Sequence, residues 1–342
     1  MVNISKKRVT LRDVAERTGY SLNTISRALK NLDIVAPSTS EEIRKVAMEL
    51  GYVPNQAARM LRSGHTRAIA LIVGSLLNPF FAMIFEHIRQ AAEESGYTIM
   101  LFSANENDAR EQASIQAALE YGVEGIILVP CQQSDACISL LEHGGVPFVL
   151  LCREFVGRNV NYVGCDELTA GRMAARHLYE AGHERLIYLR DSGFVAGIEQ
   201  RRQGFLEVAE PHGPVHQIAA AALDSHLEKR RAVAREILRL HREEGYTGVA
   251  AFCDAVARTA ILALREEDPQ TAASLGFIGF DDIDSIAPSP LPICSVRADY
   301  SAMCRRAVEM ILDKVNLDGG SPERTVFPVE VCCRKSCRGD ER

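Results

Sequence analysis

The chain has 342 residues, of which 47% are hydrophobic and 25% charged, and its formal net charge is −6. This length exceeds one ordinary domain and the apolar content suffices for a sizeable core, so several folded units are expected. Because the sequence contains no run of about 18 apolar residues and no signal-peptide pattern, we expect no membrane association and a cytoplasmic protein.

Charge is divided unevenly along the chain. Residues 1–62 contain eleven Lys and Arg and six Asp and Glu, a net +5, which leaves −11 for the remainder. The acidic total therefore does not exclude nucleic-acid binding, because the positive charge that binds phosphates is concentrated in one segment.

Short helical patterns occur near the N-terminus. Apolar residues recur at helical spacing over residues 11–15 and 22–29, with Gly19 between them and Ser21 as a good N-cap for the second helix. Two short helices joined by a glycine-containing turn are typical of a helix-turn-helix, although an amphipathic hairpin without a DNA-binding role has the same pattern. A third helix is predicted from Pro37 to residue 50, with Gly51 at its C′ position.

A dense and ungapped motif spans positions 9 to 61. Its residues are Val9, Thr10, Leu11, Asp13, Val14, Ala15, Gly19, Ser21, Thr24, Ile25, Ser26, Arg27, Gly51, Tyr52, Pro54, Asn55, Ala58, Arg59 and Leu61. This motif resembles the DNA-binding headpiece of the LacI/GalR repressors, which implies a small all-α helix-turn-helix headpiece. In that family serine usually caps the third helix. Ala36 stands there in this chain, which costs about 0.5–2 kcal/mol unless Ser38 or Thr39 takes over as the cap.

The resemblance implies that the second helix reads DNA bases through Leu22, Asn23 and Arg27, with Thr24 and Ser26 on the same face. Arginine can form a two-pronged contact with guanine, asparagine can do so with adenine, and leucine can contact a thymine methyl group. Two alternatives remain open, because Arg27 could contact only phosphate and Leu22 could belong to the headpiece core.

Residues 55–61 resemble the hinge helix of the same family. Asn55 can cap it, Ala57 and Ala58 are small enough to enter a minor groove, and Leu61 would be the wedge that kinks the central base step. A helix this short is expected to fold only with DNA and a dimer mate, the alternative being an inert tether. The expected partner is double-stranded DNA with a near-palindromic operator, bound by a homodimer. The last residues contain no heptad tail, so we expect no tetramer.

Strand-like and helix-like stretches alternate after residue 67. Strands are predicted at 68–73, 99–103, 125–129, 148–151, 186–189, 249–252, 277–280 and 293–296, and helices at 81–95, 108–121, 134–143, 167–181, 227–243, 254–266 and 301–315. This rhythm predicts doubly wound parallel sheets, and its length predicts two similar lobes. The first strand is followed by neither a Gly-x-Gly-x-x-Gly nor a Walker-type loop, which argues against a nucleotide-dependent enzyme.

Four segments of this α/β region, at residues 78–81, 122–127, 181–183 and 278–282, resemble the effector-binding body of the LacI/GalR family. That body is similar to periplasmic sugar-binding proteins, with two lobes joined by three crossing strands, here expected near residues 164–166, 288–292 and 318–328. The implied organisation is a headpiece at 1–54, a hinge helix and linker at 55–67, and an effector-binding and dimerisation domain at 68–342. Lobe 1 would comprise about 68–165 and 293–320, and lobe 2 about 166–292 and 321–342.

A small effector is expected between the lobes, at the carboxyl ends of the strands. The resemblance implies that six residues line this site: Asn78, Phe80, Phe81, Arg201, Asp254 and Asp281. Phe81 could instead be lobe core, and Asp254 only a helix cap. Arg153 follows the strand at 148–151, where many relatives have aspartate. Two arginines would suit an acidic sugar derivative, unless Arg153 turns outward and pairs with Glu154 or Asp166.

The ten cysteines contain no Cys-x-x-Cys pair. Cys332, Cys333 and Cys337 cluster in a strand-like segment. A zinc site there would need further ligands, and the nearest preceding histidine is His241. We therefore expect reduced structural thiols, solvated histidines at 212 and 216, and no metal or cofactor.

These features predict a sequence-specific transcription regulator, expected to be a repressor, whose DNA affinity is switched by a sugar or sugar derivative. A redox- or metal-sensing regulator on the same fold is the main alternative. The basic headpiece argues against a protein that only binds sugar. An enzyme would need a nucleophile–base constellation, and none stands out in the sequence.

Overall fold

The computed structural model describes residues 9–29, 34–53, 65–220, 227–285, 288–316 and 321–339. The chain divides into two compact units, Met1–Thr66 and Arg67–Arg342. Among the described residues, no helix is both long enough and apolar enough to cross a membrane.

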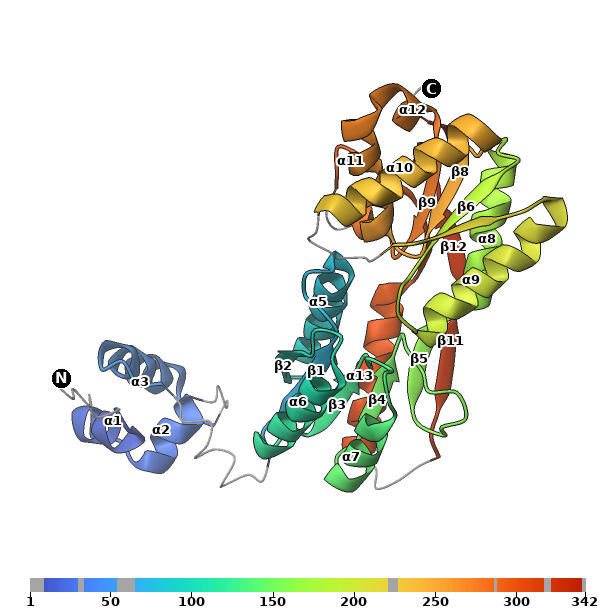
Figure 1. Cartoon of the computed structure of the whole chain (residues 1–342). Coiled ribbons are helices and arrows are strands. Elements are labelled where there is room, and N and C mark those ends of the chain that lie inside the picture. The colour runs from blue at the N-terminus through green and yellow to red at the C-terminus, as the bar shows by residue number, and fades with distance from the viewer. Residues whose placement is uncertain are drawn as a thin grey trace, which may run out of the picture. The chain divides into compact units, whose positions relative to one another are not determined.

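The first unit is a three-helix headpiece of α1 (Leu11–Thr18), α2 (Leu22–Ala28) and α3 (Pro37–Glu49) (Figure 1). Thr10 and Asp13 cap α1 reciprocally, and the Ser21 side chain caps α2. Helix α3 begins at Pro37 without a side-chain cap, so neither Ser38 nor Thr39 compensates for Ala36. A small buried core holds the helices together: Val14, Ile25, Ala28, Ile43 and Ala47.

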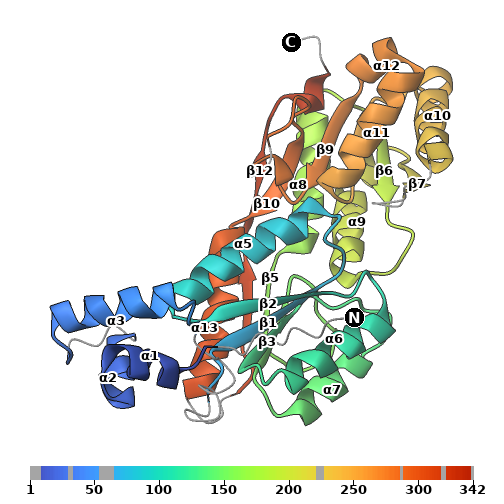
Figure 2. The same ribbon diagram turned by 90° about the vertical axis from the view of Figure 1, so that its left-hand side faces the viewer.

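Lobe 1 of the second unit is built on a parallel sheet in the order β11-β5-β4-β3-β1-β2. Its strands are β1 (Ala68–Val73), β2 (Thr98–Ser103), β3 (Gly125–Leu128), β4 (Phe148–Leu151), β5 (Tyr162–Cys165) and β11 (Arg324–Phe327). Helices α5 (Pro79–Glu94) and α13 (Tyr300–Asn316) pack together against one face, as Figure 2 shows. Helices α6 (Asp108–Glu120) and α7 (Ala136–Gly144) contribute to the apolar core on the other face.

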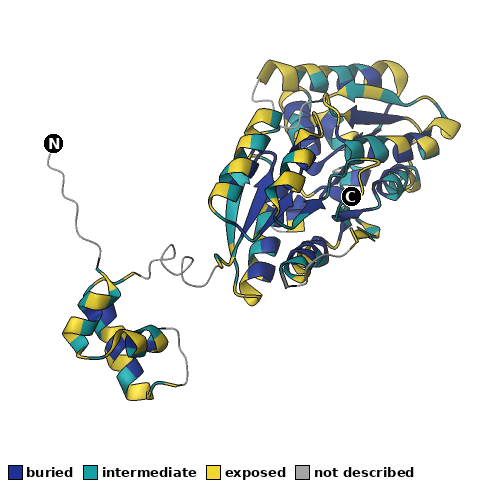
Figure 3. Ribbon diagram, turned by 90° about the horizontal axis from the view of Figure 1, so that it is seen from below, coloured by how far each residue is buried: buried dark blue, intermediate teal, exposed yellow. Residues whose placement is uncertain are grey.

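Lobe 2 contains the sheet β12-β10-β9-β8-β6-β7, in which β12 is antiparallel to β10 and the other pairs are parallel. The strands are β6 (Leu186–Arg190), β7 (His216–Ala219), β8 (Gly248–Ala251), β9 (Gly276–Phe280), β10 (Cys294–Ala298) and β12 (Val329–Cys332). Its helices are α8 (Glu167–Glu180), α9 (Ala196–Ala209), α10 (Leu227–Glu244), α11 (Asp254–Glu267) and α12 (Pro269–Ser274), with short 3-10 turns η1 (Glu210–His212), η2 (Ile283–Ser285) and η3 (Ser336–Arg338). In both lobes the central strands are buried between helices whose outer faces are exposed (Figure 3).

The expected lobe boundaries need correction. Strand β10 lies in the sheet of lobe 2, although residues 293–320 were assigned to lobe 1, and β11 lies in the sheet of lobe 1, although 321–342 were assigned to lobe 2. The chain passes between the lobes at Asp166, between β10 and α13, and at Pro328 between β11 and β12. The Pro-rich residues near 288–292 were expected to cross between the lobes, but they precede β10 within lobe 2. Proline was a misleading signal here, because it marks turns inside a lobe as readily as boundaries between lobes.

Helices α9 and α12 and strand β7 were not predicted, whereas β5 and β11 lie in two of the segments expected to cross between the lobes, near residues 164–166 and 318–328. Helix α9 contains two glycines and many polar residues, so its apolar periodicity is weak. It forms because it packs tightly against α8, a contact that sequence periodicity does not report.

Candidate DNA-binding surface and effector cavity

The outer face of α2 carries the residues expected to read DNA. Leu22 is 48% exposed, Asn23 and Arg27 are exposed, and Thr24 and Ser26 are half-buried. The exposure of Leu22 argues against a place in the headpiece core, whose α2 members are Ile25 and Ala28. The hinge residues Asn55, Ala57, Ala58 and Leu61 lie outside the described residues.

A cavity of about 520 Å³ lies between the two lobes of the second unit. Residues that follow β1, β2, β3, β4 and β5 of lobe 1 line it, together with residues that follow β6, β8 and β9 of lobe 2. The site therefore lies at the carboxyl ends of parallel strands, where ligands bind in open α/β sheets. Six of the seven residues expected at the effector site line this cavity: Asn78, Phe80, Phe81, Arg153, Arg201 and Asp281.

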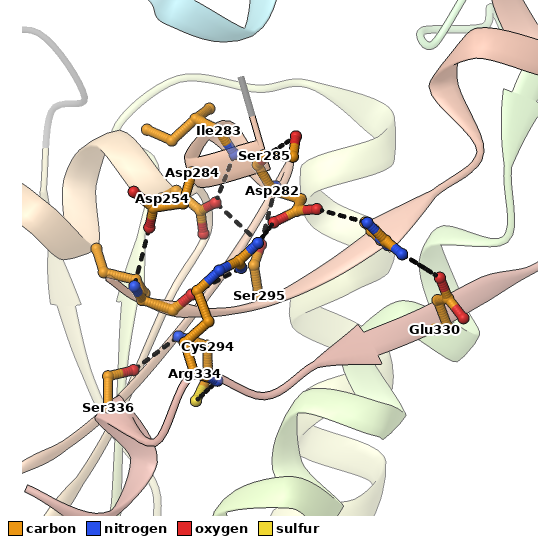
Figure 4. Close-up of polar contacts among 12 residues, drawn as sticks. Asp254, Asp282, Ile283, Asp284, Ser285, Cys294, Ser295, Glu330, Arg334 and Ser336 are labelled. Carbon is orange, nitrogen blue, oxygen red and sulfur yellow. Dashed lines mark hydrogen bonds and ion pairs between the residues drawn. The ribbon is translucent and has the colours of Figure 1, made fainter. Parts of the chain in front are cut away.

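Asp254, the seventh, is turned away from the cavity. Its side chain is fully buried, and its Oδ2 atom accepts hydrogen bonds from the Ile283 backbone N–H (3.1 Å) and the Ser295 hydroxyl (2.9 Å). Figure 4 shows this network beside the contacts of Asp282. Burial, together with the nearby charge of Asp281, raises the pKa of Asp254 well above its ordinary value. The expectation of an effector contact is thus replaced by a structural role, and the preceding residue, Cys253, lines the cavity instead.

Arg201 is the centre of a buried charge network on the lobe 2 side. Its Nε and Nη2 atoms donate to the two oxygens of Glu167, the latter at 2.9 Å, and Nη1 donates to Asp281 (3.2 Å) and to the Phe252 carbonyl (3.1 Å). Its guanidinium also lies 4.9 Å from the ring centroid of Phe280. Burial raises the pKa of Asp281 to about 6, although the Arg201 charge opposes this shift. Arg201 is therefore held in place before any ligand arrives.

Two glycines allow this arrangement. A Cβ atom on Gly171 of α8 would lie 1.9 Å from the Arg201 carbonyl oxygen, and one on Gly204 of α9 would lie 2.0 Å from the Leu168 carbonyl oxygen. Since these contacts are with backbone atoms, helices α8 and α9 approach this closely only because both positions lack a side chain. The close crossing brings Arg201 on α9 to Glu167 at the first turn of α8.

Arg153 lines the cavity from the lobe 1 side. Its Nη1 and Nη2 atoms donate to Glu106 at 2.7 and 3.1 Å, and Nη1 also donates to the Pro130 carbonyl at 3.1 Å. Glu154 pairs instead with Arg324. Arg153 therefore does not turn outward to Glu154 or Asp166, and its charge is balanced by a carboxylate of the same cavity.

The charge of the cavity wall is the reverse of the one expected from two arginines. The described residues that line the cavity include Arg153 and Arg201 but also four carboxylates: Glu106, Glu167, Asp191 and Asp281. The formal charge of these six side chains is −2, and each arginine is already paired. An acidic effector is therefore disfavoured, because it would have to displace carboxylates from both guanidinium groups.

Sequence reasoning missed Glu106, Glu167 and Asp191, which also lie just beyond the ends of β2, β5 and β6. The rule that ligands bind at the carboxyl ends of strands could have found them. Sequence reasoning also missed Gln132, which has a positive φ of 63° and accepts a hydrogen bond from the Ala196 N–H across the lobes at 3.0 Å. The same rule could have found this residue, because it follows β3 at the same edge of the sheet.

The aromatic wall of the cavity comes from α5 and α13. Phe80 packs edge-on against Phe81 and Tyr300, with ring centroids 5.5 and 5.3 Å away. All three rings are more than nine-tenths buried, and Asn78 caps α5 through the Phe80 N–H at 3.1 Å. Phe81 is thus both lobe core and cavity wall, because one face of the cluster contacts the sheet and the other borders the cavity.

Comparison with known proteins agrees with this architecture. A family model of periplasmic binding proteins and the sugar binding domain of the LacI family matches residues 66–335. A model of bacterial regulatory proteins of the lacI family matches residues 10–55. The chain is 28% identical over 340 residues to the HTH-type transcriptional regulator CelR of Thermobifida fusca, covering 97% of this chain and 99% of that protein. It is also 28% identical over 335 residues to the ribose operon repressor of Halalkalibacterium halodurans, covering 97% and 98%.

Solved structures show the same fold over nearly the whole chain. The complex of the transcriptional regulator CelR with cellobiose has a TM-score of 0.67 at 25% identity, covering 96% of this chain and 100% of that one. The Lac repressor dimer bound to operator and the anti-inducer ONPF has a TM-score of 0.77 at 19% identity, covering 97% and 100%. The resemblance read from the motifs is confirmed, and the chain belongs to the LacI family of bacterial regulatory proteins.

Proposed function

We propose that this chain is a dimeric transcriptional repressor of the cytoplasm that binds a near-palindromic operator and is switched by a neutral sugar or polyol. The observation that carries the proposal is the cavity between the lobes, in which two arginines are already paired and carboxylates outnumber them. Carboxylates accept hydrogen bonds from sugar hydroxyls, and the Phe80–Phe81 wall offers apolar surface to the C–H groups of a sugar ring.

Relatives support both halves of the proposal. One similar structure is a complex with cellobiose, one similar protein is named a ribose operon repressor, and one structure of the same fold is a dimer on its operator. Since the cavity wall comes from both lobes, a bound ligand favours one relative arrangement of the lobes over others. The mechanism is then a population shift, in which the ligand biases the lobes and so the spacing of the two headpieces on DNA.

A thermal-shift screen of the full chain against neutral sugars, sugar acids and sugar phosphates tests the ligand class. We expect neutral sugars to raise the Tm and calorimetric affinity to stay constant between low and high salt, because no net charge pairing is involved. Binding restricted to sugar phosphates, or an affinity that falls steeply with salt, contradicts the proposal.

Two glutamates of lobe 1 provide a matched pair of variants. Glu106→Gln removes a carboxylate of the cavity and is expected to weaken binding about tenfold or more, the cost of one hydrogen bond to a charged group. Glu154→Gln is the control, because Glu154 pairs with Arg324 and does not line the cavity. Operator binding, followed by fluorescence anisotropy with and without the identified sugar, then tests the switch, and light scattering tests the dimer.

A further inference from the structure

Four side chains that are distant in sequence converge at one point of lobe 2. His177 lies in α8, Cys294 is the first residue of β10, Cys333 follows β12, and Cys337 lies in η3. One ring nitrogen of His177 and the three sulfur atoms all lie within 4.8 Å of one another. The Sγ atoms of Cys294 and Cys333 are 3.8 Å apart, and those of Cys333 and Cys337 are 3.9 Å apart.

The two sulfur–sulfur separations of 3.8 and 3.9 Å match those between ligands of a tetrahedral metal site. With Zn–S bonds of about 2.3 Å, the edge between two sulfur ligands of a tetrahedron is about 3.8 Å. A disulfide, in contrast, requires about 2.0 Å between sulfur atoms. The three cysteines are free thiols. Their spacing therefore fits ligands around an ion and is too long for bonded sulfurs.

A histidine atom without a regular hydrogen bond points to the same ligand. The Nε2 atom of His177 is buried and makes no hydrogen bond of regular geometry among the described residues, and the His177 side chain interacts with the Cys294 thiol. A buried polar atom without a regular hydrogen bond costs about 1–3 kcal/mol, so such an atom on the histidine of this cluster calls for an explanation. Coordination of an ion supplies the missing partner.

The chain around the cysteines holds them in this geometry. Lys335, between Cys333 and Cys337, has a positive φ of 69°, which bends the segment so that both thiols approach the same point. The Arg334 backbone N–H donates to Cys294 Sγ at 3.2 Å, and the Cys294 N–H donates to the Ser336 hydroxyl at 2.7 Å. Figure 4 shows Cys294, Arg334 and Ser336 side by side. An N–H aimed at a sulfur favours the thiolate form that binds metals.

We propose that His177, Cys294, Cys333 and Cys337 bind a structural zinc ion. Three sulfur ligands and one imidazole in a tetrahedron are a donor set that selects Zn²⁺, and four protein ligands leave no open position for catalysis. The ion fastens the segment after β12 to α8 and β10. The chain crosses from lobe 1 to lobe 2 for the last time at Pro328, and β12 follows directly. The metal site therefore anchors the lobe 2 end of this crossing segment.

This proposed site differs from the expectation that the C-terminal cysteines are reduced structural thiols without a metal. In the sequence the nearest histidine before these cysteines is His241. The fold instead brings in His177 from α8, which precedes strands β6, β8 and β9 in the chain. The three cysteines of this cluster differ from four others in the chain. Cys131, Cys152, Cys165 and Cys253 line the effector cavity, where burial raises their pKa values and keeps them protonated.

Elemental analysis of the untagged full-length chain, purified without added metal and desalted, tests the proposal. We expect one zinc per chain in the wild type, retained in Cys332→Ser and lost in Cys333→Ser and His177→Gln. Cys332→Ser is the matched control, because Cys332 is adjacent to Cys333 but is outside the cluster. Cys333 is exposed, so its serine variant should fold, which circular dichroism checks.

Cobalt substitution gives a second readout that does not depend on purification history. After zinc is removed, Co²⁺ should produce the intense visible bands of a tetrahedral thiolate site in wild type and Cys332→Ser, with affinity at least ~tenfold lower in Cys333→Ser. Chelation should lower the Tm of the wild type but not that of Cys333→Ser. The proposal is overturned by zinc-free wild type that gives no tetrahedral Co²⁺ spectrum, by equal metal loss in Cys332→Ser and Cys333→Ser, or by a Cys294–Cys333 disulfide in freshly purified protein.

Discussion

Arg201→Met removes the cation that compensates two buried carboxylates and should be among the most destabilising single changes in the second unit. Arg201 is 9% exposed and makes two hydrogen bonds to Glu167, one to Asp281 and one to a backbone carbonyl. Removing one partner of a buried ion pair costs about 3–5 kcal/mol, because the remaining charge stays buried without compensation. Methionine retains part of the apolar packing, so we expect a loss of about 3–5 kcal/mol in the free energy of unfolding, measured by urea denaturation.

The loss should depend on pH in a defined direction. Burial already raises the pKa of Asp281 to about 6, and Arg201 is the charge that opposes this rise. Without Arg201 the folded-state pKa rises further, so between the unfolded value near 3.8 and this raised value the folded state binds more protons than the unfolded state. Stability of the variant should then fall as pH rises through this window, and the deficit relative to wild type should be larger at pH 8 than at pH 5.

Arg202→Met is the matched control. Arg202 is the next residue of α9 and pairs with Glu199 one turn away near the surface, where an ion pair contributes only about 0–1 kcal/mol. In the double variant Arg201→Met with Glu167→Leu, part of the lost stability should return, because one uncompensated carboxylate is removed as well. If Arg201→Met costs no more than Arg202→Met, or if its deficit is the same at pH 5 and pH 8, the buried network does not carry the charge compensation assigned to it.

Three further predictions follow from other parts of the molecule. Arg27→Ala should reduce the preference for operator over scrambled DNA by about 1–3 kcal/mol in fluorescence anisotropy, with the headpiece still folded by circular dichroism; an unchanged preference would mean a phosphate contact only. Gln132→Ala removes the hydrogen bond between Gln132 and Ala196 across the lobes, so it should weaken effector binding by about 1 kcal/mol and change the Tm of the protein little. An unchanged affinity would show that this bond does not favour the bound arrangement of the lobes. Gly204→Ala places a Cβ atom 2.0 Å from the Leu168 carbonyl oxygen and should cost about 1–3 kcal/mol by overpacking the α8–α9 contact, and a Tm equal to that of wild type would contradict the close crossing.

Local patterns in the sequence were sufficient for the headpiece and for the rhythm of the two lobes. Helices α1, α2 and α3 follow from apolar spacing and from caps such as Ser21, all of which act within one or two turns. The strand–helix alternation predicts parallel sheets, and parallel sheets place their carboxyl ends at one edge. That rule, together with the family resemblance, correctly brought Asn78, Arg153 and Asp281 to one cavity from separate parts of the chain.

Tertiary structure alone decided which partner each polar group meets. Two arginines in the sequence suggested an anionic effector, but Glu106 and Glu167 reach them from other elements, and Asp191 and Asp281 then make the cavity wall net negative. The same holds for His177, which becomes a neighbour of Cys333 only because α8 packs beside β12. Periodicity reports which face of an element is apolar, whereas ion pairs and metal sites depend on angstrom-scale distances between elements, and these distances are fixed only when the whole chain packs.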